Sequence, residues 1–150
     1  MTAKMPSFDS AAFRKAYHYQ GPDLGAIYRK TATTFRLWAP LADEVYVVFY
    51  RQGLGGPAVG RYPMKPSGKG TWRVRVEGDW VGVYYTYQVR HGAAEAEAVD
   101  PYAQAVGANG MRAMVVDLKK TSPAGWSRAR APAFGSPVDA IIYELHVRDA

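Results

Sequence analysis

The segment Trp72-Arg-Val-Arg-Val-Glu77 alternates apolar and charged side chains without interruption. Successive side chains of a β-strand point to opposite faces, so the segment predicts a strand whose Trp72, Val74 and Val76 face a core. The charged residues between them then face solvent. This is the clearest period-two pattern in the chain, and it sets the expected fold class.

The same alternation occurs on both sides of this segment. In residues 34–40, Phe35 and Leu37 share one predicted face, and Arg36 and Trp38 share the other. Further alternating strands are predicted at residues 45–50, 83–89 and 114–118. Residues 61–64 predict an edge strand, because Pro63 cannot donate to a central ladder. Residues 92–97 predict an exposed loop.

Turn residues separate these strands at short intervals, since the chain contains 15 glycines and 10 prolines. Short strands with frequent turns are typical of sandwiches. We therefore predict a mainly β chain in which residues 26–118 form an immunoglobulin-like antiparallel β-sandwich. Residues 1–25 form an N-terminal extension with a short helix at 11–17, capped by Asp9 or Ser10.

The composition changes after residue 118. Residues 119–137 contain three prolines and two glycines, which predicts a linker. Residues 138–147 are a nearly continuous run of apolar β-formers, typical of a strand covered on both faces in a parallel sheet. Residues 138–150 are therefore expected to be the first strand of a truncated (β/α)8 barrel. Alone, residues 138–148 are expected to be disordered or to pair with an exposed sheet edge.

Length and charge restrict the function classes. The 150 residues are too few for a complete (β/α)8 barrel. The formal net charge of +6 is spread along the chain instead of being concentrated, which disfavours nucleic-acid binding. No signal peptide or membrane-spanning run is visible, so a cytoplasmic location without membrane contact is expected, with secretion left open.

Catalytic and metal-binding patterns are not evident. The chain has no cysteine and three histidines far apart in sequence, so we expect no metal site and no cofactor. Neighbouring acids occur at 43–44, 77–79 and 95–97, but all lie in or beside predicted turns. Asp100-Pro101 is interpreted as turn initiation. The sequence therefore predicts no catalytic residue.

Aromatic side chains are the remaining candidates for binding. A flat aromatic ring can cover the apolar face of a pyranose while polar neighbours bond its hydroxyls. Trp38 and Tyr50 lie on outer strand faces and Trp80 lies in a turn, so these three are the candidate carbohydrate-binding residues. The alternative, which we favour, is that exposed aromatics pack against a second domain.

Several motifs resemble a known family in collinear order. They lie at residues 23–28 (DLGAIY), 34–40 (TFRLWAP), 82–87 (GVYYTY), 99–103 (VDPYA) and 114–118 (MVVDL). These resemble the family-48 carbohydrate-binding module of debranching enzymes and the segment joining it to the catalytic domain. Residues 142–149 (IYELHVRD) resemble the first barrel strand of family-13 glycoside hydrolases. Together they resemble a type I pullulanase.

The resemblance implies a parent enzyme that hydrolyses α-1,6-glucosidic linkages in pullulan, starch or glycogen with retention of configuration. In that family the catalytic carboxylates lie on later barrel strands, so this chain alone is expected to be a non-catalytic N-terminal accessory module. The missing barrel is its expected packing partner. The alternative is an autonomous α-glucan-binding module. Glycogen-binding relatives carry a tryptophan after the late strand, whereas residues 91–95 contain no aromatic.

Overall fold

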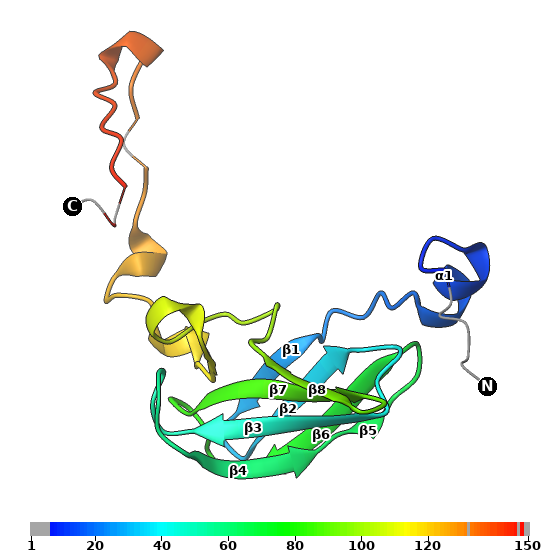
Figure 1. The fold of residues 1–150 in the computed structure, drawn as a ribbon. Helices are drawn as coiled ribbons and strands as arrows, with labels where there is room; N and C mark the ends of the chain where they lie inside the picture. Colours follow the sequence, from blue (N-terminus) through cyan, green and yellow to red (C-terminus); the bar gives the residue numbers. More distant parts are fainter. Residues whose placement is uncertain (1–6, 132, 147, 149–150) are drawn as a thin grey trace. The chain divides into compact units, whose positions relative to one another are not determined.

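The computed structural model describes residues 7–131, 133–146 and 148 (Figure 1). The chain separates into two units, residues 1–118 and 119–150. The first unit contains all the strands among the described residues. The predicted linker, 119–137, falls in the second unit. No helix among the described residues is long and apolar enough to cross a membrane.

The first unit contains a short N-terminal helix, α1 (Ala11–Tyr17), as predicted. Ser10 is its N-cap, because the Phe13 backbone N–H donates to the Ser10 side chain at 3.1 Å. Phe13 is buried and packs against Phe8, with ring centroids 5.2 Å apart. This contact gives the helix an apolar anchor.

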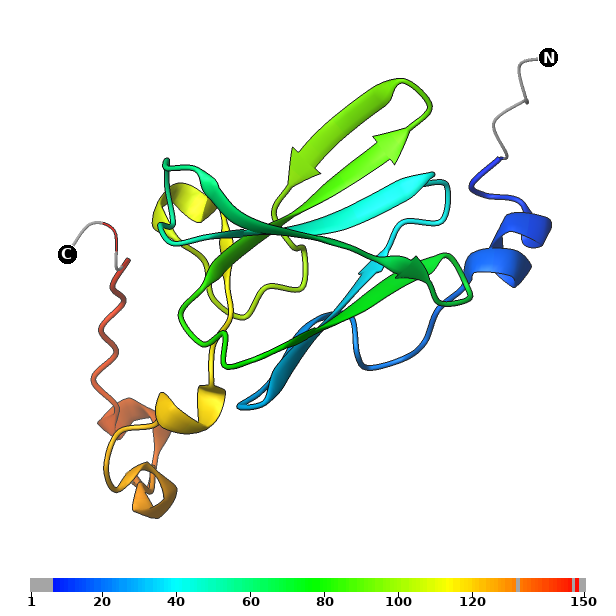
Figure 2. The same ribbon diagram turned by 90° about the horizontal axis from the view of Figure 1, so that it is seen from below.

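Two antiparallel sheets follow and face each other as a sandwich (Figures 1 and 2). One sheet has the strand order β1-β2-β6-β5, and the other has the order β4-β3-β7-β8 with the short β9 also paired to β7. The strand bounds are β1 Gly25–Arg29, β2 Ala32–Trp38, β3 Glu44–Tyr50, β4 Ala58–Pro63, β5 Lys65–Pro66, β6 Thr71–Glu77, β7 Tyr84–His91, β8 Ala94–Ala98 and β9 Ala113–Met114.

The predicted inner faces meet in the core. Phe35 and Leu37 of β2 are buried, whereas Trp38 beyond them is exposed. The core joins both sheets and comprises Phe35, Leu37, Val45, Val47, Phe49, Met64, Val76, Tyr85, Tyr87, Ala113 and Val115. The mainly β sandwich predicted from the alternation is therefore confirmed. Pro63 ends β4, which lies at a sheet edge as predicted.

The prediction of a loop at residues 92–97 is wrong. Residues 94–98 form β8, which pairs with the end of β7 from Tyr87↔Ala98 to His91↔Ala94. The segment AEAEA has poor β-propensity, so its conformation follows from the ladder with β7 and not from its own composition. Every residue of β8 is exposed, as suits an edge strand.

The predicted strand at residues 138–147 is absent from the described residues, and residue 147 lies outside them. Pro137–Asp139 form a 3₁₀ turn (η4), and residues 140–146 are extended without strand pairing. Ile141, Ile142 and Tyr143 are 99%, 89% and 83% exposed. A strand needs a neighbouring strand to satisfy its backbone groups, and no described strand pairs with this run.

Three further 3₁₀ turns complete the structure. They are η1 (Ala108–Gly110), η2 (Leu118–Lys120) and η3 (Trp126–Arg128). The strand predicted at residues 114–118 is shorter than expected, since β9 ends at Met114 and η2 begins at Leu118.

Candidate functional site

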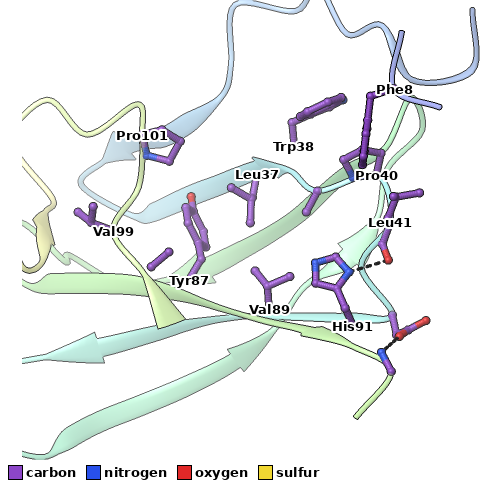
Figure 3. Close-up of a pocket in the computed structure, with 14 residues that line it drawn as sticks. Phe8, Leu37, Trp38, Pro40, Leu41, Tyr87, Val89, His91, Val99 and Pro101 are labelled. Carbon is purple, nitrogen blue, oxygen red and sulfur yellow. Dashed lines mark hydrogen bonds between the residues drawn. The ribbon is translucent and has the colours of Figure 1, made fainter. Parts of the chain in front are cut away.

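An apolar groove lies beside the end of β2 in the sandwich unit. It has a volume of about 870 Å³ and opens where Leu37 and Trp38 face the second half of β7 (Figure 3). Its lining residues are Phe8, Leu37, Trp38, Ala39, Pro40, Leu41, Asp43, Tyr87, Val89, His91, Gly92, Ala98, Val99 and Pro101. We call this surface the apolar groove.

Several polar groups of the apolar groove form hydrogen bonds within the protein. The His91 ring nitrogen Nδ1 lies 2.9 Å from the Leu41 carbonyl oxygen, and the Gly92 N–H donates to Asp43 Oδ2 at 2.6 Å (Figure 3). The Tyr87 hydroxyl donates to Asp100 at 3.4 Å. The groove therefore presents mainly carbon to a ligand.

A second hollow lies on the N-terminal side of Trp38. It has a volume of about 540 Å³ and is lined by Tyr17, His18, Tyr19, Leu24, Leu37, Trp38, Pro101 and Tyr102. We call it the tyrosine hollow. Trp38, Leu37 and Pro101 line both hollows, so the tryptophan belongs to both surfaces. Three phenolic rings, those of Tyr17, Tyr19 and Tyr102, line the tyrosine hollow.

Hydrogen bonds to the N-terminal extension hold Trp38 in place. Its indole N–H donates to the Tyr17 carbonyl at 2.8 Å, at the last residue of α1. Nearby, Lys69 Nζ donates to the Lys15 carbonyl at 2.9 Å.

The turn at Gly70 has φ +72°, and a Cβ there would lie 2.5 Å from Pro40. Only glycine suits that position.

Charges fix the segment between α1 and β1. Arg36 Nε lies 3.0 Å from Asp23 Oδ2, and the Tyr19 hydroxyl donates to the same carboxylate. The tyrosine hydrogen bond and the Arg36 charge lower the pKa of Asp23 below its ordinary value. The wall of the tyrosine hollow is thereby tied to β2.

Asp100 supports the wall that both hollows share. It is 3% exposed, and its Oδ2 accepts hydrogen bonds from Tyr85 at 2.7 Å and from Tyr87. Its Oδ1 accepts the Tyr102 backbone N–H at 2.8 Å, as in an Asx turn. The turn expected at Asp100-Pro101 is present. Burial raises the pKa of the Asp100 carboxyl, and burial together with the neighbouring Asp100 charge raises the pKa of Tyr85.

Trp38 has the exposure that the sequence predicted. It is 41% exposed and sits on the outer face of β2. Of the three candidate carbohydrate-binding residues, it alone lines either hollow.

Tyr50 is not an exposed platform, contrary to the prediction. The side chain is 6% exposed because the Arg112 guanidinium lies over the ring, 3.4 Å from its centroid. Its hydroxyl donates to Glu97 at 2.5 Å. Arg112 in turn donates to the Gln52 carbonyl at 2.8 Å. A sugar would have to displace this guanidinium to stack on Tyr50.

Trp80 packs inward from its turn. Its ring centroid lies 5.0 Å from that of Phe49 and 6.3 Å from that of Tyr62. Its indole N–H donates to the Glu77 carbonyl at 2.8 Å. The structure therefore does not gather the three predicted residues into one site.

Among the described residues there is also no group of three or more potential metal ligands.

The family model of carbohydrate-binding module 48, the isoamylase N-terminal domain, matches residues 23–103. The chain belongs to this family. The matched range runs from Asp23, which binds Arg36, to Ala103 beyond the Asp100 wall. It includes β1 to β8 and most of the lining of both hollows.

Several curated relatives of this chain are pullulanases. The Bacillus subtilis (strain 168) pullulanase is 35% identical over 140 residues, which are 93% of this chain and 18% of that protein. The chloroplastic pullulanase 1 of Arabidopsis thaliana is 34% identical over 143 residues, 89% of this chain and 15% of that protein. The chain thus spans less than a fifth of the length of each of these two curated relatives.

A solved structure agrees with both fold and family. The Paenibacillus barengoltzii pullulanase in complex with maltohexaose and alpha-cyclodextrin superposes with a TM-score of 0.85 at 49% identity. The match covers 96% of this chain and 22% of that chain. The sequence resemblance to a pullulanase carrying a family-48 module is thereby confirmed.

The sequence interpretation missed most of the groove of the module. Phe8 and Leu41 line it, yet they are far apart in sequence and neither stands in one of the quoted motifs. For the buried Asp100, the sequence predicts only a turn. Its neighbour Pro101 gave that signal, but nothing local indicates that two tyrosine hydroxyls meet the carboxylate.

Proposed function

We propose that this chain is the N-terminal accessory module of a pullulanase-type debranching enzyme that hydrolyses α-1,6-glucosidic linkages. The observation that carries the proposal is the 49% identity, over 96% of the chain, to the Paenibacillus barengoltzii pullulanase. The family-48 match over residues 23–103 supports the accessory role independently. Pullulan, starch or glycogen is the proposed substrate class of the whole enzyme.

The catalytic part of that enzyme is the proposed packing partner. The relatives are more than four times longer than the part that this chain matches. The second unit also exposes Ile141, Ile142 and Tyr143 almost completely. When a neighbouring domain covers the apolar side chains of such a run, the free energy of the protein in water falls.

Pullulan hydrolysis tests the proposed function. The purified chain is expected to release no reducing sugar, because retaining glycosidases need two carboxyl groups flanking the scissile bond and those of the family lie on later barrel strands. A chimera in which the chain replaces the matched 22% of the Paenibacillus pullulanase is expected to hydrolyse pullulan.

The opposite results would refute the proposal. Hydrolysis by the chain alone would show that the distant carboxylates are unnecessary. A folded chimera that binds pullulan but does not cleave it would show that this chain cannot serve as the accessory module.

Autonomous α-glucan binding is the second candidate function, and the tyrosine hollow supports it. A 41% exposed indole stands beside three tyrosines, which together supply a stacking face and hydroxyl partners. The solved Paenibacillus relative was obtained with maltohexaose and alpha-cyclodextrin. The glucan would then stack on Trp38 and contact neither Tyr50 nor Trp80.

Fluorescence titration with maltohexaose tests this binding. We expect Trp38→Ala to weaken binding by about fivefold, because an aromatic contact contributes about 1 kcal/mol. Tyr50→Phe is the matched control and is expected to leave binding unchanged, since Arg112 covers that ring. An unchanged dissociation constant for Trp38→Ala, or no binding by the unaltered chain at millimolar ligand, would exclude the tyrosine hollow as a glucan site.

A further inference from the structure

Three cationic side chains stand in one row across the outer face of the β1-β2-β6-β5 sheet. In the strand register, Arg36 of β2 lies opposite Arg73 of β6, and Arg73 lies opposite Lys65 of β5. The row faces away from the core, because Phe35 and Leu37 on either side of Arg36 point into it. Directly opposed side chains have Cβ atoms about 4.5–5.5 Å apart, and like charges in such pairs are destabilising. We call Arg36, Arg73 and Lys65 the cationic row.

Among the described residues, one member of the cationic row has a partner of opposite charge. Arg36 pairs with Asp23 at 3.0 Å. In the same part of the chain, no ion pair or side-chain hydrogen bond engages Arg73 or Lys65, and both are exposed. The row therefore offers two adjacent cations to an anion from outside.

A hollow of about 370 Å³ opens beside these two cations. Lys65, Ser67 and Arg73 line it together with Arg75, whose charge is paired with Glu77 at 2.7 Å. A phosphate ester carries a charge of about −1.5 to −2 at pH 7 and presents three strong acceptor oxygens. It can accept hydrogen bonds from the guanidinium, the ammonium and the serine hydroxyl together.

The exposed indole of Trp38 lies on the same sheet face as the cationic row. Trp38 and Arg36 are two residues apart on β2, with the buried Leu37 between them. Trp38 lies opposite Thr71, and Arg73 follows two residues later on β6, about 7 Å along the strand. A glucan that stacks on Trp38 therefore reaches the cationic row with an adjacent sugar unit.

We propose that the cationic row binds a phosphate monoester carried by the α-glucan that stacks on Trp38. This inference rests on the glucan binding proposed for the tyrosine hollow. An unmodified glucan is neutral and leaves Arg73 and Lys65 without a counter-charge, whereas the ester dianion pairs with both. An acidic polypeptide or free phosphate would supply the charge but would make no use of the neighbouring stacking face.

Isothermal titration calorimetry of the chain tests the site with three probes: maltohexaose, maltohexaose that carries one 6-phosphate, and inorganic phosphate. We expect the phosphorylated maltohexaose to bind about tenfold more tightly than maltohexaose, because charge-assisted hydrogen bonds are among the strong ones. Arg73→Gln is expected to abolish this gain and to leave the binding of maltohexaose unchanged. The gain is also expected to shrink as salt is added, since salt screens exposed charges.

Arg29→Gln is the matched control, since it removes the same charge from the same sheet face. Arg29 lies opposite Ala32 and outside the cationic row, so this variant is expected to keep the tenfold gain. Equal losses for Arg29→Gln and Arg73→Gln would show an effect of net charge and overturn the proposal. Inorganic phosphate bound as tightly as the phosphorylated maltohexaose would overturn the glucan as the carrier.

Failure of this proposal and failure of glucan binding give different results. If maltohexaose binds through Trp38 but its 6-phosphate adds no affinity, the cationic row is not a phosphate site and glucan binding stands. If maltohexaose does not bind at all, glucan binding fails and the glucan is excluded as the carrier. Arg73→Gln relieves a like-charge pair at an exposed position, so its melting temperature is not expected to fall. Lys65→Gln repeats the test at the neighbouring cation.

Discussion

Replacing Asp100 with alanine is expected to lower the free energy of unfolding by about 4 kcal/mol, because it leaves several buried donors without a partner. The carboxylate is 3% exposed and accepts the hydroxyls of Tyr85 and Tyr87 and the backbone N–H of Tyr102. Urea unfolding, followed by circular dichroism, measures the loss.

Glu77→Ala is the matched control for the loss of a carboxylate. Glu77 is 71% exposed at its side chain and pairs with Arg75 at 2.7 Å. Exposed ion pairs contribute little, so we expect a change below about 0.5 kcal/mol. Comparable losses for Asp100→Ala and Glu77→Ala would show that the Asp100 contacts do not stabilise the fold.

The Asp100 carboxyl also predicts a pH dependence. Burial raises its pKa in the folded protein, so the folded state holds this proton more tightly than the unfolded chain does. The stability that Asp100 contributes is therefore greatest below about pH 4, the ordinary range of the carboxyl, and falls as pH rises through the raised pKa. Asp100→Asn keeps an oxygen for the Tyr102 N–H but cannot ionise.

Unfolding of the unaltered chain and of Asp100→Asn between about pH 3 and pH 7 isolates this effect. The stability of the unaltered chain relative to the variant is expected to decrease with rising pH. Other carboxyls, such as Asp23 with its lowered pKa, contribute equally to both proteins and cancel. A relative stability that is constant or rises with pH would contradict the assignment.

The alternation of side chains predicted the sandwich because burial itself imposes that pattern. Val45, Val47 and Phe49 had to face one side of their strand, and all three are almost fully buried. Local composition could not predict β8, since its alanines and glutamates favour no strand. The ladder with β7 imposes the strand, and a ladder is a relation between segments.

Of the three residues proposed from the sequence, Trp38 has the predicted exposure, which follows from its place on an outer strand face. Tyr50 obeys the same rule of alternation, yet Arg112, remote in sequence, covers its ring. The apolar run at residues 138–146 shows the converse relation. Its composition favours a strand, but composition alone supplies no pairing partner.

Phe49→Ala is expected to lower the free energy of unfolding by about 4 kcal/mol, the range of large-to-small changes in a rigid core. Phe49 is fully buried. Its ring centroid lies 5.4 Å from that of Phe35, 4.9 Å from that of Tyr62 and 5.0 Å from that of Trp80. It therefore joins the two sheets and the turn that carries Trp80. Single domains are stable by about 5–15 kcal/mol, so this loss removes a large share.

Two controls separate the packing role of Phe49 from its hydrophobicity. Phe49→Leu keeps most of the apolar volume and is expected to cost about 1 kcal/mol, while Phe134→Ala, at a side chain 58% exposed, should stay within about 0.5 kcal/mol. Phe49→Ala should also reduce the near-ultraviolet dichroism of Trp80, because the tryptophan loses its neighbouring ring. Equal losses for Phe49→Ala and Phe134→Ala would mean that Phe49 does not join the sheets, and the described core would be wrong.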